Sequence, residues 1–215
     1  MTQAQCPACA RLQEPRLSCS NCGAPLAVEL DYFAALGLPR HLTIDLQHLE
    51  NLYHDLGRRV HPDRFADSAG PVRNASLSAT ALLTRAFRTL RDPVSRGLYW
   101  LQLHGEKLAT NNQQVPPEVA ELIFEVQETL AELRACAGDG ANSDLRAQVM
   151  ERKQSLGVSL NDTFAELENN FAKWDGAVSA NPELIVQLKG TLSRIAYLRT
   201  LLRDVDRELE GHDLG

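Results

Sequence analysis

Residues 45–65 read DLQHLENLYHDLGRRVHPDRF, and this stretch decides the fold of the chain. Apolar side chains recur there at steps of three and four residues, so one face of a helix over 45–60 is expected to pack on a core. Pro62 lacks an amide hydrogen and disfavours helical backbone at His61, so the helix should end there. The apolar positions are Leu46, Leu49, Tyr53, Leu56 and Val60.

The turn that follows this helix should form an exposed polar corner. It would present an imidazole, a carboxylate and a guanidinium together, next to two arginines in the last helical turn. We interpret the corner as a docking surface for a partner protein, and an ordinary Pro-Asp turn is the alternative. The residues of this predicted surface are Arg58, Arg59, His61, Pro62, Asp63 and Arg64.

Four motifs follow one another through the first half of the chain. They are DYFAALGL at 31–38, HPDRF at 61–65, AFRTLRDP at 86–93 and YWL at 99–101. Together they resemble the J domain, the co-chaperone module that stimulates ATP hydrolysis by DnaK-class chaperones. The resemblance implies a helical hairpin within residues 31–105. It also implies that Asp63 meets an arginine of the chaperone, while His61 and Pro62 fix the geometry of that contact.

The composition favours helices throughout the rest of the chain. Of 215 residues, 44% are hydrophobic but only 6% are aromatic, and few segments alternate in the manner of strands. A polar linker is expected at 106–116, followed by helices over about 117–135, 143–173 and 182–210. Three antiparallel helices would form a compact bundle. We therefore predict an all-α fold, with a J domain and a C-terminal three-helix domain over 117–215.

The charge of the chain is divided unevenly. The net charge is −6, but residues 31–105 carry nine Lys and Arg against seven Asp and Glu, while residues 117–215 carry ten against eighteen. Phosphate binding needs clustered cations, so the totals argue against a general nucleic-acid binder. The two halves of opposite sign suggest two different protein partners.

Four of the five cysteines form two CxxC pairs separated by nine residues. This spacing indicates one tetrahedral metal site in a short, zinc-ribbon-like segment over residues 1–30. So small a segment cannot bury a useful core, so bound zinc would supply most of its folding energy. Two disulfides, an iron site and redox chemistry are the alternatives. The predicted ligands of one structural zinc are Cys6, Cys9, Cys19 and Cys22.

A second docking surface is expected on the C-terminal helices. A helical projection places Phe124 nearly opposite the apolar face of its helix and Tyr197 roughly opposite Leu188 and Leu192. Exposed aromatics in a chain with few aromatics suggest a contact surface, although either ring could instead pack on a neighbouring helix. The predicted surface contains Ile123, Phe124, Gln127, Glu128, Ala131 and Tyr197.

The chain as a whole resembles the HscB family of J-type co-chaperones of iron–sulfur cluster assembly, in the form with an N-terminal tetracysteine segment. In that family the C-terminal domain binds the IscU scaffold protein, and the J domain engages HscA or an equivalent DnaK-class chaperone. The scaffold-binding segment matches residues 123–128, and Tyr197 stands where the family uses an aromatic contact. The resemblance thus implies two protein partners and one zinc.

The chain carries no phosphate-binding loop, HExxH motif or triad-like arrangement, so ATP chemistry would belong to a partner and the chain is not expected to be an enzyme. A general J protein for misfolded clients and a zinc-ribbon adaptor for nucleic acid are the alternative functions. No apolar run approaches the roughly 20 residues of a membrane span, and no export signal precedes Cys6. We expect a bacterial cytoplasmic location rather than the mitochondrial matrix.

Overall fold

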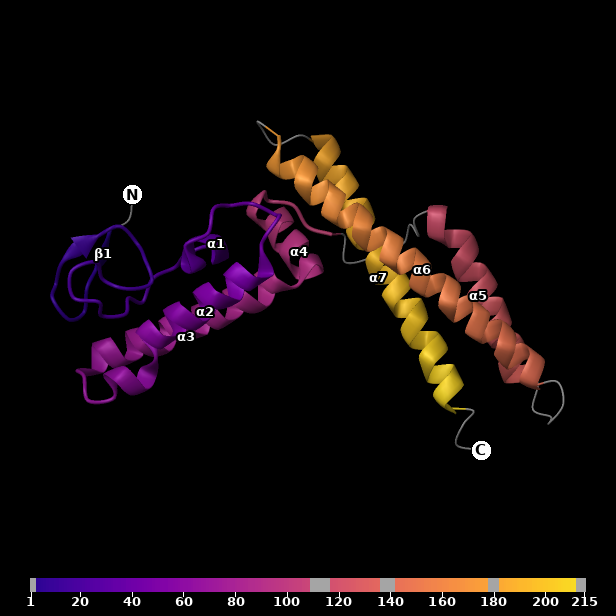
Figure 1. The fold of residues 1–215 in the computed structure, drawn as a ribbon, viewed down its shortest axis with the longest axis horizontal. Coiled ribbons are helices and arrows are strands. Elements are labelled where there is room, and N and C mark those ends of the chain that lie inside the picture. The colour runs from indigo at the N-terminus through magenta and orange to yellow at the C-terminus, as the bar shows by residue number, and fades with distance from the viewer. Residues whose placement is uncertain (1–2, 109–116, 136–141, 178–181, 212–215) are drawn as a thin grey trace. The chain divides into compact units, whose positions relative to one another are not determined.

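The computed structural model of the chain describes residues 3–108, 117–135, 142–177 and 182–211 (Figure 1). They fall into two compact units, Met1–Trp100 and Leu101–Gly215. Helices dominate both units, which confirms the predicted all-α class. Most of the predicted linker, residues 109–116, lies outside the described residues.

The N-terminal segment holds the only sheet among the described residues. Strand β1 (Ala4–Gln5) pairs antiparallel with β2 (Leu12–Gln13), and a bridge joins Ser18 to Pro25. Strands of two residues supply few backbone hydrogen bonds and little apolar burial. Other contacts must therefore hold this segment together.

A helical hairpin forms the body of the first unit. Helix α1 (Tyr32–Leu36) is capped by the Asp31 carboxylate, which accepts a hydrogen bond from the Ala34 amide at 2.9 Å. Helices α2 (Leu46–Val60) and α3 (Gly70–Arg91) lie side by side, and α4 (Pro93–Leu103) follows (Figure 1). The short 3-10 helix η1 (Pro62–Phe65) joins α2 to α3. The predicted end of the first long helix before Pro62 is confirmed.

Aromatic rings tie α1 to α4 within this unit. Tyr32 stacks on Tyr99 with ring centroids 4.2 Å apart, and the Tyr99 hydroxyl accepts the Tyr32 amide at 2.9 Å. Phe33, which is fully buried, meets Trp100 edge to face at 5.6 Å. Such pairs add to the free energy gained by burial alone. The aromatic rings of Tyr32, Phe33, Tyr99 and Trp100 therefore fix how these two short helices pack.

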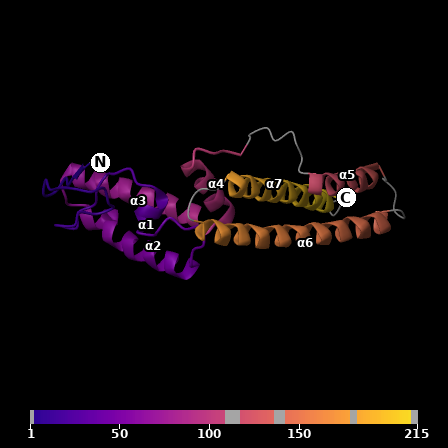
Figure 2. The same cartoon turned by 90° about the horizontal axis from the view of Figure 1, so that it is seen from above.

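The second unit contains three long helices, α5 (Pro117–Ala135), α6 (Asn142–Asp175) and α7 (Pro182–Gly211). Both α5 and α7 run along α6, as Figure 2 also shows. The observed bounds confirm the three predicted helices to within two residues at each end. None of the helices in the described ranges combines the length and apolar character of a membrane span.

Buried aliphatic side chains fill the part of the core that α5, α6 and α7 share, and a buried polar contact between α6 and α7 helps to fix the register. Leu130, Leu156 and Leu198 come from different helices and are almost completely buried together. Between α6 and α7, the buried Asn170 side-chain amide donates to the Thr191 hydroxyl at 3.0 Å. A register shift would leave these polar groups unpaired, which is costly in an apolar interior.

Candidate functional site

The backbone at the end of α2 leaves the helix at His61, whose φ and ψ are −56° and 132°. The Arg64 amide donates to the His61 carbonyl at 3.1 Å, and the Asp63 amide donates to His61 Nδ1 at 3.3 Å. These bonds close a tight turn around Pro62. The turn therefore holds the imidazole against the backbone of the corner.

The carboxylate of Asp63 projects from this turn into solvent. Its side chain is 90% exposed, and one carboxylate oxygen lies 3.5 Å from His61 Nδ1. The exposed carboxylate oxygens can thus accept hydrogen bonds from an incoming cationic group.

Two hydroxyl groups of α3 donate hydrogen bonds to the end of α2 and so hold the corner in place. The Ser76 hydroxyl, which is fully buried, donates to the Val60 carbonyl at 2.6 Å, and the Thr80 hydroxyl reaches the same oxygen at 3.3 Å. The Arg64 guanidinium donates to the Arg58 carbonyl at 3.1 Å. These bonds satisfy carbonyl groups that a helix end leaves without a partner. Sequence reasoning did not identify Ser76 or Thr80, since no local pattern links them to a helix that ends 16 residues earlier.

A shallow groove of about 540 Å³ lies beside the corner. Tyr53 forms one wall of this groove, and its ring stacks on that of Phe87 with centroids 4.2 Å apart. Arg58 and Arg59 are exposed, and Arg58 forms an ion pair with Asp55. Three residues of the predicted surface, Arg58, His61 and Arg64, therefore share this groove. The groove is lined by Tyr53, His54, Gly57, Arg58, His61 and Arg64.

The structure brings the four predicted metal ligands together. Their sulfur atoms all lie within 4.8 Å of one another. Cys6 Sγ is 3.5 Å from Cys22 Sγ, and Cys9 Sγ is 3.7 Å from Cys19 Sγ. A disulfide bond would place two sulfurs about 2 Å apart, so the four residues are free thiols here. The arrangement matches four ligands around one ion.

The two CxxC pairs adopt the same backbone turn. The Ala10 amide donates to the Cys6 carbonyl at 3.0 Å, and the Gly23 amide donates to the Cys19 carbonyl at 2.9 Å. Both Ala10 and Gly23 have left-handed backbone, with φ of 59° and 75°. Glycine adopts this conformation readily, whereas alanine pays roughly 1 kcal/mol for it. The turn at Cys6–Ala10 therefore adopts a backbone conformation that alanine disfavours, and other contacts must hold it in place.

The ionisation of the thiols fits a cation among them. A hydrogen bond from the Cys22 amide lowers the pKa of the Cys19 thiol to about 6. A hydrogen bond from the Ala24 amide favours the Cys22 thiolate. Partial desolvation and the neighbouring sulfurs outweigh this hydrogen bond and raise the pKa of Cys22 to about 12. Four thiolates so close repel one another, and a divalent ion removes this repulsion. The residues present thus fit a thiolate-bound metal such as zinc.

The exposed face of α5 carries the second predicted surface. Phe124 is 68% exposed, and Gln127, Glu128 and Ala131 are exposed beside it. Ile123 is partly buried against the bundle core. The expected exposure of Phe124 is confirmed, and it shares one exposed face with Gln127, Glu128 and Ala131, while Ile123 lies at the border of that face.

Tyr197 is less exposed than the helical projection suggested, and it follows the alternative in which the ring packs on a neighbouring helix. Its side chain is half-buried and packs against the bundle core. It precedes the buried Leu201 by one helical turn, so the two share a face of α7. The projection relied on Leu188 and Leu192, but α5 also packs on the C-terminal half of α7 and widens the buried face there.

Curated relatives match most of the chain, and two of them are HscB homologs. The co-chaperone protein HscB homolog of Aromatoleum aromaticum is 31% identical over 187 residues, which cover 86% of this chain and 96% of the relative. The co-chaperone protein HscB homolog of Azoarcus sp. is 29% identical over 189 residues, which cover 86% and 98%. No protein-family model matches the chain.

Two solved structures share the fold. Chaperone HscB from Vibrio cholerae has a TM-score of 0.62 and 24% identity, covering 85% of this chain and 99% of its own. Human co-chaperone protein HscB has a TM-score of 0.67 and 23% identity, covering 94% and 96%. At these identities the likeness bears on the fold alone, and it agrees with the predicted helical architecture.

Proposed function

The chain belongs to the HscB family of co-chaperones, and on this basis we propose that it assists iron–sulfur cluster assembly by joining a scaffold protein to an ATP-driven chaperone. The observation that carries the proposal is the corner at His61–Arg64. There a nearly fully exposed carboxylate stands on a backbone turn fixed by buried hydroxyl groups. Such preorganisation suits a contact that must act on a partner rather than merely adhere to it.

The J domain, residues 31–105, would dock on a DnaK-class chaperone such as HscA. The Asp63 carboxylate accepts hydrogen bonds from an arginine of the chaperone, because charge-assisted pairs of this kind are strong and directional. Arg58, Arg59 and Arg64 add basic charge that speeds encounter with an acidic surface. The ATP is hydrolysed by the chaperone, and this chain supplies no catalytic group.

The C-terminal domain, residues 117–215, would hold an IscU-like scaffold protein. Phe124 offers a large apolar ring that gains free energy when a partner covers it. The exposed Glu128 carboxylate lies on the same face and would pair with a basic group of the scaffold. Tyr197, with part of its ring exposed, would contribute at the edge of this contact.

The cysteine segment would bind one zinc ion through Cys6, Cys9, Cys19 and Cys22. Its role is structural, since four protein sulfurs complete a tetrahedral shell and leave no open position for a substrate. The ion would stabilise two turns that are too short to fold by apolar burial alone.

A reconstituted ATPase assay tests the proposed function. The purified chain is mixed with an HscA-class chaperone, with or without an IscU-like scaffold, and phosphate release is measured at steady state. We expect the chain and the scaffold together to stimulate hydrolysis by more than the sum of their separate effects. Equal stimulation with an unrelated misfolded client in place of the scaffold would instead support a general J protein.

A further inference from the structure

An apolar cluster joins the cysteine segment to the helical hairpin of the same unit. Two of the predicted metal ligands, Cys6 and Cys19, are 2% and 4% exposed and share this cluster with Leu26 and Val72. Phe65 packs against it as well. Val72 belongs to the first turn of α3, and Phe65 is the last residue of η1. The metal site and the start of α3 therefore share one small core.

The two helical residues in this cluster, Phe65 and Val72, follow the docking corner in the chain and lie close to its parts. Phe65 follows Asp63 by two residues within the same 3-10 helix. Val72 precedes Ser76 by four residues, about one turn of α3, so both side chains lie on one side of that helix. Ser76 is the buried hydroxyl that anchors the Val60 carbonyl. A change in the packing of this cluster therefore affects both the corner and the Ser76 hydroxyl that anchors it.

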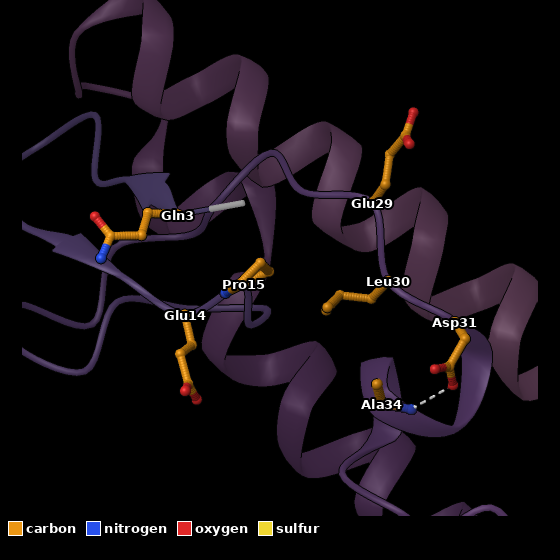
Figure 3. Close-up of a pocket in the computed structure, with 7 residues that line it drawn as sticks. All are labelled: Gln3, Glu14, Pro15, Glu29, Leu30, Asp31 and Ala34. Atoms are coloured by element: carbon orange, nitrogen blue, oxygen red, sulfur yellow. Dashed lines mark hydrogen bonds between the residues drawn. The ribbon is translucent and has the colours of Figure 1, made fainter. Parts of the chain in front are cut away.

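Contact between the cysteine segment and the hairpin is incomplete elsewhere. A pocket of about 520 Å³ lies between Glu14 and Pro15 of the segment and the chain at Glu29–Asp31 (Figure 3). A second hollow of about 360 Å³ separates Leu17 from α1 and α2. The cluster around Val72 is the contact through which the segment reaches the start of α3.

We infer that the cysteine segment is a metal-dependent support for the docking corner, acting through the positioning residues Phe65 and Val72. Without metal, the segment is held by two short strands, a bridge and two tight turns, and these bury too little apolar surface to keep Leu26 and the cysteines in the cluster. Phe65 and Val72 then lose their cover. The corner loosens although the helices persist. This inference rests on the proposed function only where chaperone stimulation is measured.

Hydrogen–deuterium exchange tests the support directly. Elemental analysis of the anaerobically purified full chain should first give about one zinc per chain. The zinc is then removed with a strong chelator and the protein is transferred to chelator-free buffer, because the ATPase assay needs Mg²⁺. We expect amides of residues 62–76 to exchange several-fold faster, while those of α5 to α7 keep their rates. Stimulation of the chaperone should fall several-fold in the same sample and return when zinc is restored.

A matched pair of variants tests the packing of the cysteine segment on the hairpin without removing a metal ligand. Leu26→Asn removes an apolar side chain that is 1% exposed, whereas Leu12→Ser changes one that is 58% exposed in the same segment. Leu26→Asn should raise exchange at 62–76 and reduce stimulation, and Leu12→Ser should leave both unchanged.

Three results would overturn the inference: no bound metal, unchanged exchange at 62–76 after chelation, or equal behaviour of the two variants. If exchange responds as expected but the native chain does not stimulate the chaperone at all, the support stands and the proposed function fails. The two claims are therefore distinguished by one set of samples.

Discussion

The docking corner and the exposed face of α5 differ in how each is built. At the corner, polar groups project from a turn whose backbone is bonded to Ser76 and Thr80. On α5, Phe124 and its neighbours stand on a regular helix that the bundle core supports from the opposite side. The first surface depends on geometry, and the second depends on apolar area that a partner can cover. Substitutions in the two surfaces should therefore impair the function of the chain in different ways.

The largest effect is expected for Asp63→Asn, and His61→Gln should act similarly. Asp63→Asn keeps the shape of the side chain but removes the charge that an arginine would recognise, so stimulation of the chaperone ATPase should be abolished. Binding of the scaffold and the thermal melt should not change, because the side chain is 90% exposed. Asp67→Asn, at an exposed carboxylate four residues away, is the control and should be silent. Normal stimulation by Asp63→Asn would refute the role of the corner.

Ser76→Ala tests whether the geometry of the corner matters apart from its charge. The substitution removes the shorter of the two bonds to the Val60 carbonyl in a fully buried site, and should cost about 1–2 kcal/mol of folding free energy. Stimulation should fall in part, with the exposed groups unaltered. Chemical denaturation and the ATPase assay measure the two effects. A stability loss with full stimulation would mean that the corner tolerates movement.

Parts of this architecture could be predicted from sequence because they depend on neighbouring residues. Helical periodicity, Pro62 and the CxxC spacing are local signals, and the helix ends and the clustered sulfurs agree with them. The contact of Ser76 with Val60 could not be predicted, because it depends on how two helices pack. The sequence left open whether the Tyr197 ring is exposed or packed on a neighbouring helix for the same reason, since α5 and α7 meet only in the folded bundle.

Phe124→Ala and Tyr197→Ala should separate binding from stability on the α5 and α7 surface. Loss of the exposed Phe124 ring should weaken scaffold binding by more than about 1 kcal/mol and barely change the melting temperature. Loss of the half-buried Tyr197 ring should also weaken binding, but should cost about 2 kcal/mol of folding free energy, less than a fully buried aromatic. Calorimetric titration and thermal melts measure both. Unchanged affinity for both variants would move the scaffold site elsewhere.

The smallest effect is expected for Glu128→Lys. Reversing one exposed charge should weaken scaffold binding by up to about 1 kcal/mol, and the loss should shrink as salt is added. Glu168→Lys, at an exposed carboxylate of α6, serves as the control and should have less effect. Titrations at low and high ionic strength provide the measurement. A loss that does not depend on salt would argue against a basic patch on the scaffold.

A mixing experiment tests most directly whether one molecule must carry both surfaces. Asp63→Asn and Phe124→Ala chains, each at half the native concentration, are combined with the chaperone and a limiting amount of scaffold, and steady-state ATP hydrolysis is compared with that of the native chain. Since the scaffold-binding chain lacks a working corner and the other chain binds scaffold weakly, we expect stimulation no greater than the sum of the two variants alone. Recovery of native stimulation in the mixture would contradict the account, because the two surfaces would then not need to act in the same chain.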